Sequence, residues 1–182
     1  MLARGLRGGE DGLTMATVEL LGVTLPVSVE PGAEDVVGEV LPVIQGAADV
    51  LNAQSARGQL SPIAIQYVQA LKGLGVALHR SFTPCAGTAD EAYGEFVFFI
   101  GADDVAVNPD PLWYASTIIH DGGHAWLSQQ GQPSTGVPVE EALTQVQIDY
   151  YDAVGGRPTY VQSLVAYKAD PSAIQARIQQ EV

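Results

Sequence analysis

The sequence predicts a single α+β domain, in which a small mixed or antiparallel sheet precedes a helical second half. Two segments, 17–29 and 95–100, are rich in β-branched and aromatic residues and have the composition of strands. The second half repeats apolar residues at helical spacing between helix starts and glycine stops. Residues 15–182 show no repeat, low-complexity tract or linker, so we expect one domain after a flexible leader at 1–14.

The first elements are expected to be a strand or hairpin and then a helix. Residues 17–29 carry many β-branched side chains, and Pro31 follows them at the opening of the expected helix. The acidic pair Glu34 and Asp35 opens the helix, because acidic residues favour the first turn. Apolar residues then follow the helical period to about Asn52, where we expect the helix to end.

A second helix and two strands are expected next. Ser61 followed by Pro62 combines an N-cap with proline at the first helical position, and the helix should reach about residue 74. Residues 76–82 indicate a strand, and 84–94 a loop. Residues 95–100 are the strongest strand candidate in the chain.

The second half is expected to be helical. Asp110 before Pro111 is an N-cap with proline at the first helical position, and that helix should run to about Gln130. After a short loop, the next helix is expected over 139–154, where glycines end it. Residues 159–182 should form two more helices.

The composition limits the partners and the compartment. A net charge of −13 with 8 basic residues repels nucleic acid and anionic membrane surfaces, so we expect neither as a partner. A hydrophobic content of 47% with 16% charged residues argues against disorder. The sequence has no apolar run long enough for a membrane span, and the N-terminus has no apolar signal segment, so a cytoplasmic location is expected.

The segment His120-Asp121-Gly122-Gly123-His124 predicts a metal site. Its two histidines stand at positions i and i+4 of the expected helix, where side chains are neighbours. Two such imidazoles can share one metal ion. Because Cys85 is the only cysteine, any further protein ligand must come from aspartate, glutamate or the third histidine.

The third ligand is expected from the start of the following helix. Glu140 and Glu141 both stand there, and the sequence leaves open which of them reaches the metal. Glu141 and Gln145 form an i, i+4 pair, so one can bind the metal while the other accepts a hydrogen bond from a ligand histidine. Asp149 continues the same stripe.

Residues 95–154 resemble the gluzincin branch of the zincin metallopeptidases in the order of their elements. A strand is followed by Asn-Pro-Asp-Pro, a helix with His-x-x-x-His, a loop and a helix that begins with glutamate. The resemblance implies a zincin-like fold in which the strand at 95–100 is the sheet edge that aligns an extended substrate. It implies Zn²⁺ as the cofactor and a peptide or protein as the substrate. His120, His124 and Glu141 would bind the zinc.

The same resemblance assigns roles to the neighbouring residues. Asp121 takes the place of the general base, and Gln145 that of an aspartate which orients a ligand histidine. The family has glutamate at the base position, and aspartate retracts the carboxylate, a displacement of about 1 Å that can cost about 10²-fold in rate. Tyr150 and His79 are candidates for binding an oxyanion or the substrate.

Three other interpretations use the same residues. A zincin fold that has lost catalysis would act as a binding or regulatory module. Alternatively, Ile-Ile-His-Asp-Gly-Gly-His is similar to the metal-binding segment of HD-domain phosphohydrolases, with His79 and either Asp149 or Asp152 as further ligands. In the third interpretation, both motif histidines are ordinary partly buried side chains.

Overall fold

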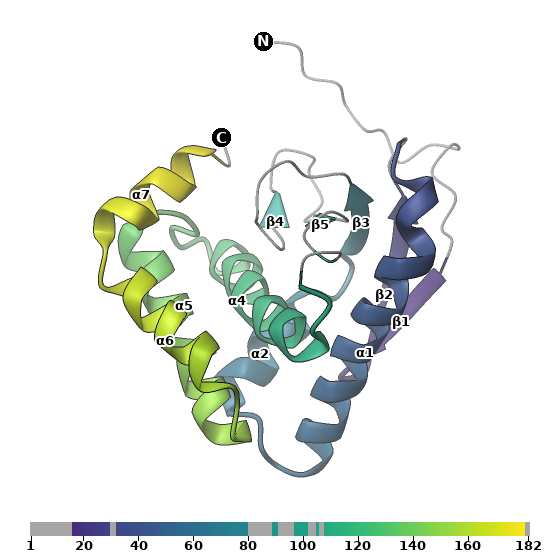
Figure 1. Ribbon diagram of the computed structural model, residues 1–182, viewed down its shortest axis with the longest axis horizontal. Coiled ribbons are helices and arrows are strands. Elements are labelled where there is room, and N and C mark those ends of the chain that lie inside the picture. Colours follow the sequence, from purple (N-terminus) through teal and green to yellow (C-terminus); the bar gives the residue numbers. More distant parts are fainter. Residues whose placement is uncertain are drawn as a thin grey trace.

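The computed structural model describes residues 16–29, 32–79, 89–90, 97–101, 105 and 108–180. These residues form an α+β protein in which helices pack against one mixed sheet (Figure 1). Helix α4 (Pro111–Gln129) lies in the middle, with α5 to α7 on one side and α1 with β1 and β2 on the other. The expected leader at 1–14 and Cys85 lie outside the described residues.

The sheet has five strands in the order β1-β2-β3-β5-β4. Strands β2 and β3 are parallel, as are β3 and β5, whereas the β1–β2 and β4–β5 pairs at the two sides are antiparallel. The sheet is therefore mixed. The strand bounds are Ala16–Leu20 for β1, Val23–Val29 for β2, Gly75–His79 for β3, Ala89–Asp90 for β4 and Val97–Gly101 for β5.

The strand predicted at 95–100 is found as β5, but its place in the sheet differs from the prediction. It pairs with β3 along its whole length and with β4 on its other side, so it is not the sheet edge. The two-residue strand β4 falls within the segment predicted to be a loop, 84–94. The prediction was wrong here because pairing partners are set by contacts between distant residues rather than by composition.

The helices follow the predicted order. No helix among the described residues is long and apolar enough to cross a membrane. The short 3-10 helix η1 spans Glu34–Val36, and the other helices are α1 (Val37–Ala56), α2 (Pro62–Ala70), α5 (Val137–Val154), α6 (Pro158–Lys168) and α7 (Pro171–Gln180).

The helix caps have the side-chain contacts that the sequence predicts. Ser61 accepts a hydrogen bond from the backbone N–H of Ala64 at the start of α2. Asp110 does the same for the N–H of Leu112 at the start of α4. Both prolines that follow these caps stand where a backbone N–H has no helical partner, so they cost no hydrogen bond. Gly155 ends α5 in the left-handed conformation with φ of 69°.

Two glycines in the middle of α4 allow neighbouring helices to come close. A Cβ on Gly122 would overlap the backbone oxygen of Tyr67 in α2. A Cβ on Gly123 would overlap Leu143 of α5 and lie 3.0 Å from the Tyr67 ring. These glycines are unfavourable within a helix by about 1 kcal/mol each. Their presence is explained by the packing that brings α2 and α5 onto α4, next to the two motif histidines.

Candidate metal centre

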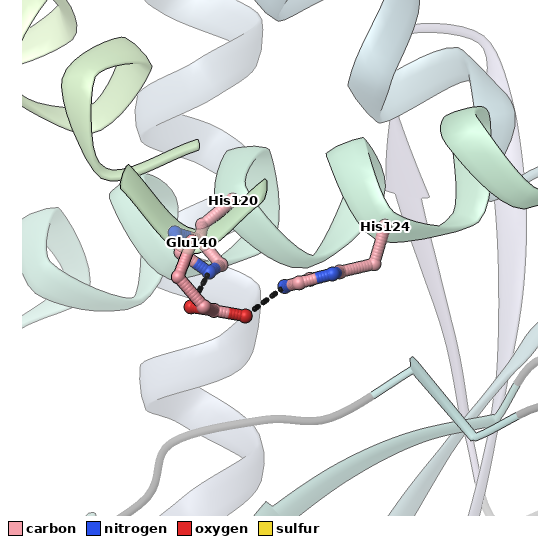
Figure 2. Close-up of side chains that lie close together, drawn as sticks. All are labelled: His120, His124 and Glu140. Atoms are coloured by element: carbon pink, nitrogen blue, oxygen red, sulfur yellow. Dashed lines mark ion pairs between the residues drawn. The ribbon is translucent and has the colours of Figure 1, made fainter. Parts of the chain in front are cut away.

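Three side chains from α4 and α5 converge at the motif. Glu140 lies between the two imidazoles and contacts each with a different carboxylate oxygen (Figure 2). His120 Nε2 lies 3.2 Å from Glu140 Oε2, and His124 Nε2 lies 3.2 Å from Glu140 Oε1. The two rings are 5.0 Å apart between centroids. His120 and Glu140 are buried, and His124 is partly buried.

The second nitrogen of each ring faces an oxygen atom. His120 Nδ1 lies 3.0 Å from Gln147 Oε1, and His124 Nδ1 lies 2.6 Å from the backbone oxygen of Ser134. A backbone oxygen only accepts hydrogen bonds, so the Nδ1 of His124 carries a proton. In a neutral His124 ring, Nε2 then directs its lone pair at Glu140. Histidines that bind metal normally donate the other N–H to a carbonyl or carboxylate in this way.

The charges around the group favour a cation. Burial opposes ionisation of Glu140, but its hydrogen bonds with the two imidazoles outweigh that effect and lower its pKa well below the usual range. Burial lowers the pKa of His120, the hydrogen bond with Glu140 opposes this only in part, and the charges of His124 and Arg177 lower it further. Burial also acts against protonation of His124, but the hydrogen bond to Glu140 and the charge of Asp121 raise its pKa. A lone pair facing a carboxylate at this range is favourable only with a proton or a cation between them.

The three donor atoms could hold a metal ion. They all lie within 4.8 Å of one another. In a tetrahedral site with bonds of about 2.0–2.1 Å, neighbouring donor atoms are about 3.3–3.4 Å apart. Each imidazole nitrogen lies 3.2 Å from a carboxylate oxygen of Glu140, close to that value, and the two contacts end at different oxygens. Two imidazole nitrogens and one carboxylate oxygen form the kind of three-ligand set that leaves a fourth position for water or substrate.

Glu140, and not Glu141, is the acidic member of this group. Glu141 is the next residue and points about 100° further around α5, where it is only partly buried. Gln145 accepts a hydrogen bond from Lys168 and donates one to Asp149, so this pair lies on the outer side of α5. Gln145 therefore does not orient a ligand histidine. That contact is made by Gln147.

The other predicted site residues are placed as follows. Asp121 is buried beside the group, and its charge acts on His124. Tyr150 is buried and donates to Gln54 Oε1 of α1 at 2.8 Å, away from the imidazoles. His79 ends β3, and its side chain is not among those that the structure describes. Among the described residues, the metal-capable group does not contain Tyr150.

Sequence reasoning missed Gln147 and the backbone oxygen of Ser134. A helical signal for Gln147 was present, since it stands seven residues after Glu140 and four after Leu143, on one stripe of α5. Tyr151 extends that stripe by another turn. Ser134 gave no signal, because a backbone oxygen in a loop has no pattern in the sequence.

Comparison of the chain with protein families, with curated proteins and with solved structures gave no match.

Proposed function

We propose that this protein is a zinc-dependent hydrolase of the metallopeptidase type, acting on peptide or protein substrates. The observation that carries the proposal is the group of His120, His124 and Glu140, in which both imidazoles turn Nε2 to one carboxylate. The Nδ1 atoms of both rings are occupied by oxygen acceptors, which leaves the Nε2 atoms for the metal. Zn²⁺ takes this combination of nitrogen and oxygen ligands.

The proposed chemistry divides between the ion and the chain. When bound, Zn²⁺ supplies a Lewis acid that polarises a carbonyl group and lowers the pKa of a water molecule toward about 7. Asp121 is the proposed proton acceptor, since it follows the first ligand directly and its charge already acts on His124. Asp121 is buried, with 3% of its surface exposed.

Zinc binding is tested with a matched pair of glutamate variants. We expect the purified protein to bind one Zn²⁺ ion, measured by elemental analysis and by competition with a chelator. Glu140→Gln should weaken zinc affinity by at least about 10–100-fold, because loss of a supporting contact alone has that effect. Glu141→Gln changes the same charge on the adjacent residue and should bind zinc as the natural protein does. Equal affinities in the two variants would remove Glu140 from the site.

Catalysis is tested separately from binding. With a library of unstructured peptides, we expect cleavage by the zinc-loaded protein, and a decrease of about 10²–10⁴-fold in kcat for Asp121→Asn at unchanged zinc content. A protein that binds zinc and cleaves no peptide would instead be a binding or regulatory module. Gain of cleavage in Asp121→Glu would then show that the shorter side chain limits the reaction.

A further inference from the structure

A buried chain of polar groups runs between α4 and α5 up to His120. The Tyr151 hydroxyl lies 3.0 Å from Ser116 Oγ, and Gln147 Nε2 lies 3.4 Å from the same Ser116 oxygen. Gln147 Oε1 then lies 3.0 Å from His120 Nδ1. Ser116 and Tyr151 have no exposed surface, and Gln147 is 5% exposed. Water therefore has little access to these groups, and the protein must satisfy their hydrogen bonds.

The directions of the hydrogen bonds at Ser116 follow from one backbone oxygen. Ser116 Oγ lies 2.7 Å from the backbone oxygen of Trp113, which can only accept, so the single serine proton is donated there. Ser116 Oγ must then accept at its other contacts. Tyr151 donates its hydroxyl proton to Ser116 at 3.0 Å, with the backbone oxygen of Leu112 as a more distant acceptor at 3.4 Å, and Gln147 donates through its amide nitrogen.

The orientation of Gln147 determines the tautomer of His120. With its nitrogen turned to Ser116, Gln147 turns its oxygen to the imidazole. That oxygen can only accept, so His120 carries a proton on Nδ1, and in the neutral ring Nε2 presents its lone pair to Glu140. A reversed amide would turn the Gln147 oxygen to Ser116 Oγ, whose single proton is already donated to Trp113, and leave that contact without a proton.

We propose that Ser116, Gln147 and Tyr151 form a positioning network that fixes the tautomer and ring orientation of His120. The network favours a proton on Nδ1 with or without a metal, whereas the Glu140 carboxylate favours one on Nε2 unless a cation lies between them, so the effect of the network on metal affinity rests on the proposed function. His124 is held in a different way, through the backbone oxygen of Ser134. A change in the network should therefore alter His120 and leave His124 unchanged, which provides an internal control.

The test compares two neighbouring hydroxyls that share one acceptor. Ser116 and Thr117 both donate to the backbone oxygen of Trp113, but only Ser116 also contacts Gln147 and Tyr151. Ser116→Ala and Thr117→Val therefore lose the same bond to Trp113. In metal-free protein above the pKa of its histidines, nitrogen NMR of the rings should show the same share of the Nδ1–H form of His120 in Thr117→Val as in the natural protein. Ser116→Ala should add the Nε2–H form of His120 only.

A second pair of variants keeps the proposal testable if Ser116→Ala does not fold. Gln147→Met fills a similar volume without an acceptor, whereas Gln147→Glu keeps an acceptor for His120 Nδ1. We expect Gln147→Met to mix the tautomers of His120 and to weaken zinc binding by about 10–100-fold, the cost of losing such a partner. Gln147→Glu should retain the Nδ1–H form.

The outcomes separate this proposal from the proposed function. If the natural protein binds no zinc while His120 changes tautomer in Ser116→Ala and Gln147→Met, the network stands and the zinc site is wrong. If the protein binds zinc but His120 keeps its tautomer and its zinc affinity in both variants, the network is overturned. Equal changes at His124 would also overturn it, because they would reveal a general loss of structure.

Discussion

On the buried face of α5, the Thr144 hydroxyl lies one helical turn after Glu140. It has no exposed surface and no hydrogen-bond partner among the described residues. Burial of a hydroxyl without a partner is unfavourable by about 1–3 kcal/mol, and an apolar group of the same shape removes that cost. We expect Thr144→Val to raise the free energy of unfolding by about 1 kcal/mol, measured by denaturant titration.

Thr117→Val is the matched control for that substitution. Its hydroxyl is also buried, but it donates to the backbone oxygen of Trp113 at 3.2 Å. Loss of this bond should lower the free energy of unfolding by about 0.5–1.5 kcal/mol. The two substitutions should therefore have opposite signs. Destabilisation of similar size in both would mean that Thr144 has a partner.

The sequence predicted the two histidines of the candidate site, but it did not predict which of two adjacent glutamates belongs to the site. His120 and His124 follow directly from the spacing of the motif. Which of Glu140 and Glu141 faces the histidines depends on the rotation of α5 about its own axis. That rotation is fixed by the packing of Leu143 against Gly123, a contact between helices that sequence spacing alone does not specify. The start of this helix was predicted at residue 139, two residues after its observed start at Val137, so the prediction could not decide between the two glutamates.

At the scale of whole elements, the packing of α2 across α4 depends on Gly122. A Cβ at this position would overlap the backbone oxygen of Tyr67, and backbone cannot move aside as a flexible side chain can. We expect Gly122→Ala to lower the free energy of unfolding by about 1–3 kcal/mol, in spite of the better helix propensity of alanine. Denaturant titration monitored by circular dichroism measures this change.

Gly38 in α1 provides the control for a glycine within a helix. A Cβ there would meet nothing within 4 Å, so alanine should be neutral or stabilise the protein by up to about 1 kcal/mol. If Gly122→Ala had the same small effect as Gly38→Ala, the close contact between α2 and α4 would be wrong.

The helices were easier to predict than the arrangement of the strands. Local groups define the helix starts, since Ser61 and Asp110 each accept from a backbone N–H two or three residues later. The position of β5 between β3 and β4 depends on partners that are distant in sequence or very short. Strand β4 has only two residues, Ala89 and Asp90, which are too few to show the alternating pattern that predicts a strand.

For the whole molecule, zinc binding should appear as a gain in stability. An ion that binds only the folded state stabilises it by about 2.7 kcal/mol at a concentration 100 times the Kd. Calorimetry in the presence of increasing Zn²⁺ should show a rising Tm that a chelator reverses. Glu140→Gln should lose most of this increase. The same rise in Glu140→Gln and the natural protein would indicate that zinc binds elsewhere.

The stability of the whole molecule should also decrease at alkaline pH, because α5 buries two adjacent tyrosines. Burial raises the pKa of Tyr150 and of Tyr151 well above the usual value. Tyrosines in the unfolded chain lose their protons near pH 10, where the folded protein still holds both. The unfolded state then binds fewer protons, so the free energy of unfolding falls as the pH rises.

Each of these tyrosines should contribute a slope of about 1.4 kcal/mol per pH unit above pH 10, up to its pKa in the folded protein. Denaturant titrations at pH 8 and at three values between 10 and 11.5 measure the slope. The Tyr150→Phe variant loses the hydrogen bond to Gln54, so it should be less stable than the natural protein at pH 8. Because phenylalanine does not ionise, that difference should shrink as the pH rises. A difference that stays constant to pH 11.5 would mean that Tyr150 ionises as easily in the folded protein as in the unfolded chain.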